Sequence, residues 1–347
     1  GDIMAPASSL PPPQHSSSLP PPQHHGVGSL AFRPTDRSAD AEAWRSDPDV
    51  ARAWLHLRHP SAATAFRHPN RTVALVPGEP DRTISLAQLA LAFELGLGPL
   101  SLRKTIDAGI GVRTFGVYSQ QSVTDIASLH ELLWSVQPDL LIEIGTFCGG
   151  SAVFFARTME SYNRNAKVIT IDRTSASSRR SVCRTEAFVP GPSAMESAHW
   201  RELTAAKRII SIVGRTTSPS LLKMIGRHVS AAKAVFVCDD GDHMKKPLIE
   251  HWALYSSFVT VGGYYIVQDT RIEMDCAYAM LTTKLSADNW CRQVLRGEGP
   301  SAAVSNITAS PGFARQWIQD RAVEKWVITQ HPGGYFRRIA PPIGLTM

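Results

Sequence analysis

Acidic and imidazole side chains follow two apolar runs in the second half of the chain. The run Ala234–Cys238 leads directly into the sequence DDGDH at residues 239–243, and the run Tyr264–Val267 leads into Gln268 and Asp269. Apolar runs of this length are typical of buried strands. In an open parallel α/β sheet the chemistry lies at the carboxyl ends of the strands, which is where these polar residues are expected.

These side chains suit a divalent cation and a proton transfer, and Asp240 and His243 are the candidate catalytic residues. We expect Asp240 and Asp269 to reach one cleft from neighbouring strand ends, because hard oxygen ligands completed by solvent suit Mg²⁺. His243 can lie on the same side at the start of the next helix, where an imidazole is matched to general-base work near neutral pH. Helix caps and surface charge remain the alternative interpretation.

A glycine-rich turn lies between a predicted strand and a predicted helix at residues 139–159, DLLIEIGTFCGGSAVFFARTM. The apolar run Leu140–Ile144 contains one acid, Glu143, which is costly to bury without partners. The glycines let the backbone approach a ligand closely, and the helix start offers free N–H groups. Phe147 stands where a dinucleotide fingerprint has its second glycine, so a pyrophosphate cofactor is disfavoured.

The pattern E-x-G-x-x-x-G-G resembles the first motif of the class I S-adenosylmethionine-dependent methyltransferases. Asp172, at the end of the next predicted strand Lys167–Ile171, stands where this fold binds ribose hydroxyls. The turn after a third strand, Arg208–Val213, would flank the adenine. A structural acid, a helix cap and a plain helix start remain alternatives for single positions. The cofactor-binding residues expected from the resemblance are Glu143, Gly145, Gly149, Ser151, Asp172, Gly214, Arg215 and Gln121.

Longer segments resemble one family of small-molecule enzymes. The opening block that begins GVYSQQSVTDIASLHELLWSVQPD, the segments DDGDH and GGYYIVQDT, and the late PGGYFRRI at Pro332–Ile339 are similar to the cephalosporin hydroxylase family. That family resembles metal-dependent O-methyltransferases, including macrolide-sugar and rhamnosyl enzymes. The resemblance covers Gly116 to about Ala340, some two-thirds of the chain.

The resemblance implies how a metal ion would be held. It places the metal aspartate on Asp240, the general base on His243 and a strand-end acid pair on Gln268 and Asp269. Relatives usually carry Glu-Asp at that pair. A glutamine can coordinate through its carbonyl oxygen but brings no charge, so we expect weaker metal binding and a stronger need for substrate oxygens. The acids that would be available to compensate are Asp239 and Asp242.

These residues require a doubly wound α/β sheet to bring them together. We expect a class I methyltransferase, Rossmann-like fold of seven strands with the last strand antiparallel. The two closing strands are predicted at Lys325–Thr329 and Gly334–Ile339, after a helix near Phe313–Asp320.

Three regions are expected along the chain. Residues 1–38 are rich in Pro, Ser and His and are predicted to be a disordered tail. Residues 39–115 are predicted to form a mainly helical N-terminal cap, with helical periodicity at Ile84–Leu95. Residues 116–347 form the predicted methyltransferase domain. The cap could serve subunit contacts, which leaves a homo-oligomer open.

Composition limits the partners and the compartment. The 347 residues are 43% hydrophobic and 19% charged, with a formal net charge of +6. The sequence has no run of about eighteen apolar residues for a membrane span, and its basic residues form no concentrated stripe for nucleic acid. Five widely spaced cysteines without a C-x-x-C pair predict reduced thiols and a cytoplasmic compartment.

We therefore predict an S-adenosyl-L-methionine- and Mg²⁺-dependent O-methyltransferase that acts on a hydroxyl of a small molecule, a sugar or another polar natural product. Two other classes stay open. One is a cofactor-binding module without catalysis. The other is a different enzyme on the same sheet, either an NAD-dependent one, against which Phe147 argues, or a methyltransferase with a nucleic-acid or protein acceptor.

Overall fold

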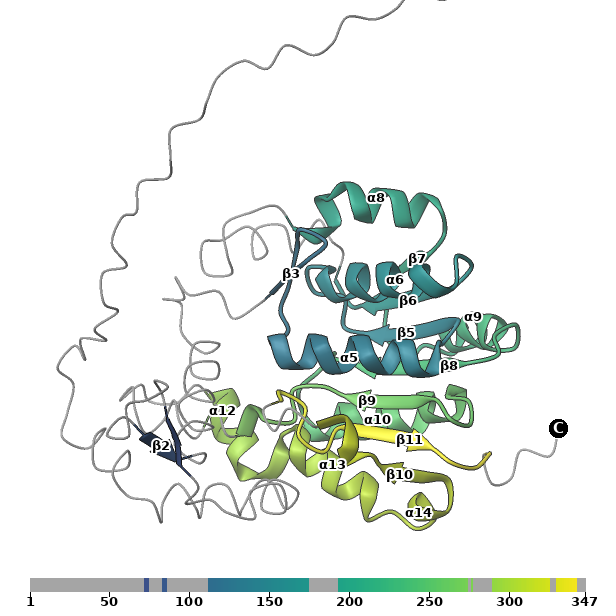
Figure 1. Ribbon diagram of the computed structural model, residues 1–347. Coiled ribbons are helices and arrows are strands. Elements are labelled where there is room, and N and C mark those ends of the chain that lie inside the picture. Colours follow the sequence, from purple (N-terminus) through teal and green to yellow (C-terminus); the bar gives the residue numbers. More distant parts are fainter. Residues whose placement is uncertain are drawn as a thin grey trace, which may run out of the picture.

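A seven-stranded sheet runs through the part of the chain that the computed structural model describes, namely residues 72–74, 83–85, 112–174, 193–273, 276, 289–324 and 329–341. Its strand order is β10-β11-β9-β8-β5-β6-β7 (Figure 1). The strands are β5 Leu140–Ile144, β6 Lys167–Asp172, β7 Ile209–Val213, β8 Val235–Asp239, β9 Tyr264–Val267, β10 Trp317–Gln319 and β11 Tyr335–Arg338.

The five strands from β5 to β9 are parallel, and β11 runs antiparallel to both β9 and β10. The predicted doubly wound sheet with an antiparallel closing strand is therefore confirmed. Runs of Leu, Ile and Val fit these strands because parallel sheets are covered on both faces. All five residues of β5 are buried, including Glu143.

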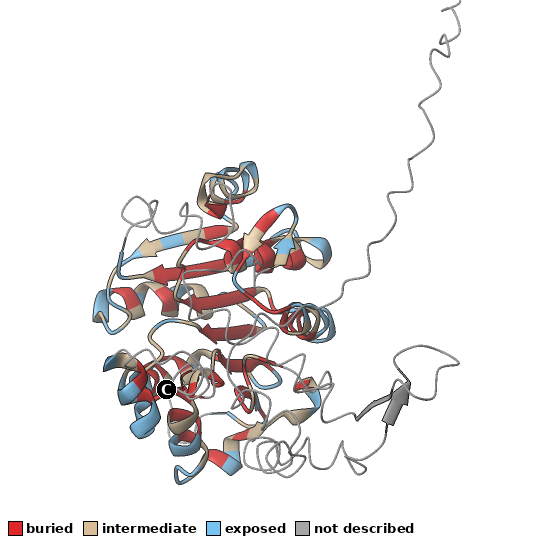
Figure 2. Cartoon of the chain, turned by 90° about the vertical axis from the view of Figure 1, so that its left-hand side faces the viewer, coloured by how far each residue is buried: buried red, intermediate tan, exposed pale blue. Residues whose placement is uncertain are grey.

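Helices cover the two faces of this sheet, and buried residues concentrate in the strands between them (Figure 2). One face packs against α5 Val123–Val136, α6 Gly150–Tyr162 and α8 Ala198–Ala205. The other packs against α9 Pro219–Val229, α10 Lys245–Tyr255, α13 Pro300–Thr308 and α14 Phe313–Gln316. A shorter helix, α12 Asn289–Gln293, lies outside these two layers. Among the described residues, no helix is long and apolar enough to cross a membrane.

The connections change direction at β5. The chain moves from β5 to β6 and β7 on one side, then crosses back to β8 and β9 on the other. A crevice forms outside the carboxyl ends of the strands at such a switch point. This topology brings the ends of β5, β6, β8 and β9 around one crevice, although the residues come from distant parts of the sequence.

The closing strands differ from the prediction in one respect. Tyr335–Arg338 lies within the predicted strand Gly334–Ile339, but its outer partner is β10 at Trp317–Gln319. The helix predicted near Phe313–Asp320 ends at Gln316, because the chain becomes extended at Trp317, whose ring is buried. Most of Lys325–Thr329 lies outside the described residues.

The described pieces of residues 39–115 are extended. The strands β1 Thr72–Ala74 and β2 Thr83–Ser85 form an antiparallel pair, so the helical period predicted from Ile84 does not begin there. A second hairpin, β3 Val112–Thr114 with β4 Val117–Ser119, precedes α5. The predicted tail at 1–38 and most of the predicted cap lie outside the described residues.

The cysteines correct the expectation of reduced thiols. Cys276 and Cys291 form a disulfide with their Cα atoms 5.3 Å apart, and Cys148 is also disulfide-bonded. Cys238 is free and buried in β8. Spacing along the sequence did not reveal these pairings because bridging depends on the spatial separation of Cα atoms. The prediction of a cytoplasmic compartment loses the support that reduced thiols would have given it.

Candidate active site

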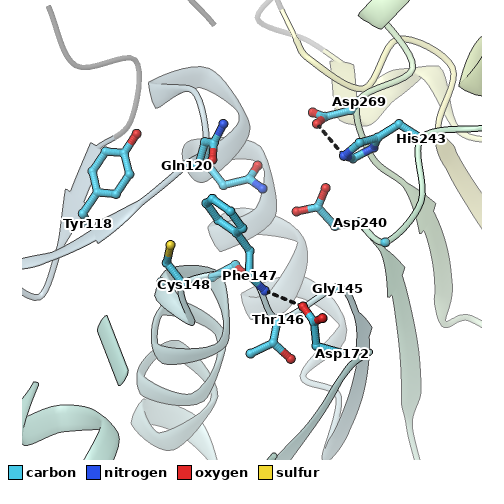
Figure 3. Close-up of a pocket in the computed structure, with 14 residues that line it drawn as sticks. Tyr118, Gln120, Gly145, Thr146, Phe147, Cys148, Asp172, Asp240, His243 and Asp269 are labelled. Carbon is cyan, nitrogen blue, oxygen red and sulfur yellow. Dashed lines mark hydrogen bonds and ion pairs between the residues drawn. The ribbon is translucent and has the colours of Figure 1, made fainter. Parts of the chain in front are cut away.

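A cavity of about 330 Å³ opens at the carboxyl edge of the sheet (Figure 3). Its wall comes from the ends of β4, β5, β6, β8 and β9 and from the start of α6. Figure 3 shows Asp172 and the glycine loop on one side, with Asp240, His243 and Asp269 grouped on another. Of the predicted site residues, seven line this cavity: Gln121, Gly145, Ser151, Asp172, Asp240, His243 and Asp269.

The glycine loop is shaped by close backbone contacts. Gly145 has φ +96°, and a Cβ atom there would lie 2.0 Å from the carbonyl oxygen of Asp240. A Cβ atom on Gly150, at the start of α6, would lie 2.0 Å from the carbonyl oxygen of Tyr118. Only glycine fits such separations. The loop is therefore held between the end of β8 and the β3–β4 hairpin, which leaves its cavity side open.

Asp172 is held in place at the end of β6. Its carboxylate accepts hydrogen bonds from the backbone N–H of Phe147 over 3.1 Å and from the backbone N–H of Thr174 over 3.0 Å. Phe147 has φ +44°, a left-handed conformation that points its N–H toward this carboxylate. A carboxylate fixed at the cavity wall is an acceptor for hydroxyl groups.

Glu143 lies beneath the glycine loop and is fully buried. It accepts a hydrogen bond from the Thr170 hydroxyl over 2.5 Å. Burial raises the pKa of Glu143 to about 7, against the Ser151 and Thr170 hydroxyls, which lower it. The charge of this carboxylate is thus incompletely satisfied, and a hydrogen-bond donor or a cation nearby would stabilise it.

Asp240, His243 and Asp269 converge at the ends of β8 and β9. One ligand atom from each lies within 4.8 Å of those of the other two. The Nε2 atom of His243 is 3.8 Å from Oδ2 of Asp269. Burial, and after it the carboxylates of Asp269, Glu143 and Asp239, raises the pKa of Asp240 well above its usual range. Like charges gathered in this way favour a proton or a metal cation between them.

Gln268 has other partners. Its side chain is buried, its Oε1 accepts a hydrogen bond from Nε2 of Gln121 over 2.5 Å, and its own Nε2 lies 2.6 Å from Sγ of Cys238. Gln268 is not among the described residues that line the cavity. Its amide oxygen is engaged by Gln121, so the structure offers an ion the carboxylates of Asp240 and Asp269, with the His243 imidazole beside them.

Asp239 and Asp242, the acids considered as compensating ligands, also lie elsewhere. Both oxygens of Asp239 are 3.1 Å from Nδ1 of His251, and the Tyr265 hydroxyl donates to Oδ2 over 2.9 Å. Asp239 is buried on the α10 side of the sheet and serves this network. Asp242 lies 4.0 Å from the Arg173 guanidinium.

Gly214 and Arg215, predicted to flank an adenine, are not found among the described residues that line the cavity. The N–H of Gly214 continues the ladder between β6 and β7 by donating to the Asp172 carbonyl over 2.8 Å, and Arg215 is exposed. Gly149 lies behind the loop, where its Cα faces the side chains of Trp200 and Met195. The cofactor-binding role of Gly149, Gly214 and Arg215 stays a prediction.

A family model described as rhamnosyl O-methyltransferase/CmcI matches residues 111–339 of this chain. The match spans well over half of the sequence. The chain belongs to the rhamnosyl O-methyltransferase/CmcI family.

Two rhamnosyl O-methyltransferases are similar to slightly less than half of the chain. A rhamnosyl O-methyltransferase of Mycobacterium bovis is 27% identical over 158 residues, which are 45% of this chain and 56% of that protein. A rhamnosyl O-methyltransferase of Mycobacterium leprae is 27% identical over 161 residues, 45% of this chain and 59% of that protein. The chain thus spans somewhat more than half the length of these relatives.

Solved structures of O-methyltransferases and of CmcI are similar at lower sequence identity. A CmcI structure with Mg and SAM has a TM-score of 0.41 and 16% identity, and the match covers 66% of this chain and 77% of that one. The O-methyltransferase TomG of Streptomyces achromogenes, in complex with SAM, has a TM-score of 0.37 and 18% identity, covering 64% and 85%.

Several cavity residues were not among the predicted site residues. They are Tyr118, Gln120, Thr146, Phe147, Cys148, Gly150 and Gly241. The second glycine of the pair 149–150 was a signal for Gly150, since α6 begins there. Tyr118 carries no such signal, because its place at the cavity depends on how the β3–β4 hairpin packs against α6.

Proposed function

We propose that this protein is an S-adenosylmethionine-dependent O-methyltransferase that uses a divalent cation, preferably Mg²⁺, and acts on a hydroxyl of a small molecule. One observation supports it above the others. A glycine loop with a fixed acid and a group of two carboxylates and one imidazole face the same cavity. Membership of the rhamnosyl O-methyltransferase/CmcI family supports the same reaction class.

The cavity fits a nucleoside cofactor on its glycine-loop side. Gly145 and Gly150 let the loop backbone pack directly against the carbonyls of Asp240 and Tyr118, and Asp172 presents a fixed acceptor for ribose hydroxyls. Ser151 lines the cavity beside this loop, and Glu143 is buried behind it, outside the lining, where its carboxylate would stabilise a positive group of the cofactor. S-adenosylmethionine supplies an electrophilic methyl group when bound.

The other side fits a divalent cation. Asp240 and Asp269 offer oxygen ligands, and the pKa of Asp240 is raised by burial and, after it, by repulsion from neighbouring carboxylates that an ion would relieve. A cation there supplies Lewis-acid activation of an acceptor hydroxyl. His243 is the base: its Nε2 accepts the hydroxyl proton, and Asp269, 3.8 Å away, stabilises the imidazolium that forms. Alignment of the reacting groups can lower the barrier by roughly 7–11 kcal/mol.

The acceptor class follows from the polar cavity and the relatives. Gln120 and Tyr118 line the wall together with the acids, and such groups suit a polyhydroxylated molecule. The two mycobacterial relatives are named rhamnosyl O-methyltransferases. We therefore favour a sugar hydroxyl over an apolar phenol.

A mass-shift assay tests this proposal. Purified protein, S-adenosylmethionine, Mg²⁺ and a panel of hydroxylated metabolites should yield a product heavier by one methyl group, and a chelator should abolish it. His243→Ala should keep cofactor affinity within about twofold and lower turnover by about 10²–10⁴. Unchanged turnover in that variant would remove His243 from the mechanism.

A second candidate is a cofactor-binding module without catalysis. It is favoured by Gln268, whose neutral amide is bound to Gln121 at a position where the family resemblance leads us to expect an acid. Calorimetry that detects cofactor binding without any divalent-cation binding, together with no methyl transfer to the panel, would support this candidate and reject the enzyme.

A further inference from the structure

We infer that His331 is a positioning residue that holds Asp269 in the conformation in which its carboxylate faces His243. Its effect on metal binding depends on the proposed function, whereas the positioning itself depends only on the hydrogen bonds of His331. His331 does not line the cavity among the described residues, so it does not act on substrate directly.

His331 is fully buried shortly before β11, and both ring nitrogens are engaged. The backbone N–H of Asp269 donates to Nδ1 of His331 over 2.9 Å. Because Nδ1 accepts this bond, the ring proton lies on Nε2, which donates to Oε1 of Gln121 over 3.2 Å. These two hydrogen bonds use both ring nitrogens and thus fix one tautomer of the imidazole.

Asp269 has a backbone conformation that needs such support. Its φ is +54°, in the left-handed region that residues other than glycine rarely adopt. Residues held in this region persist when the surrounding structure constrains them, and they concentrate at functional sites. In Figure 3 the Asp269 carboxylate points from the end of β9 toward His243. The bond to His331 constrains the one backbone N–H whose direction changes with this φ.

Two more hydrogen bonds join the turn after β9 to the segment around His331. The Thr270 hydroxyl donates to the carbonyl of Pro332 over 2.9 Å, and the N–H of Arg271 donates to the carbonyl of Gln330 over 3.2 Å. The turn that carries Asp269 is therefore held by residues about 60 positions later in the sequence.

The segment around His331 is in turn anchored to the start of α5. Asp125 is fully buried, and its carboxylate accepts the N–H of Gln330 over 2.9 Å and the hydroxyl of Thr329. The Thr329 hydroxyl oxygen also accepts the N–H of His331 over 2.9 Å. Asp125 thus fixes the place of the imidazole, and the imidazole fixes the turn at Asp269.

Two substitutions separate the roles of the two ring nitrogens. His331→Asn keeps an acceptor, Oδ1, as many bonds from Cα as Nδ1, and loses the contact with Gln121. His331→Gln keeps a polar atom at the position of Nε2 and loses the acceptor for the N–H of Asp269. His331→Ala removes both. Thermal unfolding of the full chain shows which variants fold, and the Asn variant is the matched control.

The first measurement is hydrogen exchange at the Asp269 amide, which requires no metal. We expect protection in the wild type and in His331→Asn, and exchange faster by about tenfold or more in His331→Gln, a ratio that corresponds to about 1.4 kcal/mol. Equal protection in the wild type and His331→Gln would overturn the inference. So would a loss in His331→Asn as large as in His331→Gln.

The second measurement is Mn²⁺ affinity by electron paramagnetic resonance, alongside S-adenosylhomocysteine affinity by calorimetry. His331→Gln should bind Mn²⁺ about tenfold more weakly and the cofactor product unchanged, while His331→Asn should match the wild type. Wild-type affinity for Mn²⁺ in His331→Gln would contradict the inference. A wild type that binds no Mn²⁺, with the exchange result as expected, would reject the metal in the proposed function and leave the positioning role supported.

Discussion

At the scale of single residues, Glu143 combines a central position with an unfavourable charge. It lies in β5, an interior strand of the sheet, and the neighbouring strands β6 and β8 pair Thr170 and Cys238 with it on either side. Burial raises its pKa to about 7 from 4.5. A shift of this size disfavours the charged form by about 3 kcal/mol. Under the proposed function, a bound cofactor would compensate for this cost, which lowers the stability of the free protein.

Glu143→Gln should therefore stabilise the cofactor-free protein at high pH. An acid with a raised pKa contributes most stability below its unfolded-state value, and this contribution is lost as pH rises from 4.5 to about 7. The variant should match the wild type near pH 4 and exceed it by up to about 3 kcal/mol at pH 8.5. Urea unfolding at both pH values measures the difference.

The same variant should bind the cofactor more weakly, by about tenfold or more, because a neutral amide no longer stabilises a positive group. Calorimetry with S-adenosylmethionine measures this at pH 8. A variant that is less stable than the wild type at pH 8.5, or that binds the cofactor equally well, would contradict the role given to the Glu143 carboxylate.

At the scale of elements, the glycine loop and the end of β8 are in direct backbone contact. Gly145→Ala would place a Cβ atom 2.0 Å from the Asp240 carbonyl oxygen, at a residue with φ +96°. We expect a loss of about 3 kcal/mol or more in the free energy of unfolding, because both steric overlap and backbone strain oppose the change. The displaced strand end should also abolish detectable Mn²⁺ binding.

Gly262→Ala is the matched control for this prediction. Gly262 has φ +84° but no heavy atom within 4 Å of the added Cβ, so only the backbone conformation is penalised. That change should destabilise by about 1–2 kcal/mol and leave ligand binding intact. Equal effects of the two substitutions in urea unfolding would show that contact with Asp240 is unimportant.

His251 joins a second set of elements on the face of the sheet that packs against α10. Its Nδ1 faces Asp239 of β8, its Nε2 is 2.8 Å from the Thr216 hydroxyl after β7, and Tyr255 and Tyr265 surround the pair. Burial alone would lower the pKa of His251. The charge and hydrogen bond of Asp239, with further help from Asp242 and Glu250, outweigh burial and raise it.

The pH dependence of stability should follow from this sign. A raised histidine pKa stabilises the folded state fully below 6.5, and this contribution is lost as pH rises through the folded-state pKa. The difference in unfolding free energy between wild type and His251→Asn should therefore be largest below pH 6.5 and shrink toward pH 9. His228, whose pKa is lowered by burial, Lys167 and Arg227, should show the opposite trend in His228→Asn. The same trend in both would contradict the assignment.

At the scale of the whole molecule, the proposed cofactor and cation would both be held by the ends of several strands, so their binding should stabilise the entire sheet. Saturating Mg²⁺ at about 100 times its dissociation constant should add about 2.7 kcal/mol, or roughly 5–10 °C in Tm. Asp269→Asn should remove the Mg²⁺-dependent shift and keep the cofactor-dependent shift, since asparagine tolerates the left-handed conformation. Asp172→Asn should do the reverse. Thermal scans with a chelator as control measure both, and a shift lost equally in both variants would mean one shared site.

The strands and the main site residues were predictable because their causes are local. Runs of Leu, Ile and Val between polar turns form buried strands, and a parallel sheet exposes residues directly after its strands at one edge. Asp172, Asp240 and Asp269 each follow such a run, so their presence at one cavity followed from topology alone. The short strand Trp317–Gln319 lacked this signal, because three residues show no period that separates a strand from a helix end.

The tertiary structure decided which polar groups form hydrogen bonds with one another. Gln268 pairs with Gln121, Asp239 with His251, and His331 with the backbone of Asp269, across separations of 147, 12 and 62 residues. The disulfide between Cys276 and Cys291 likewise depended on the approach of two Cα atoms. A sequence shows the hydrogen-bonding capacity of each side chain. Which partner uses that capacity depends on distances and directions that exist only after the chain has folded.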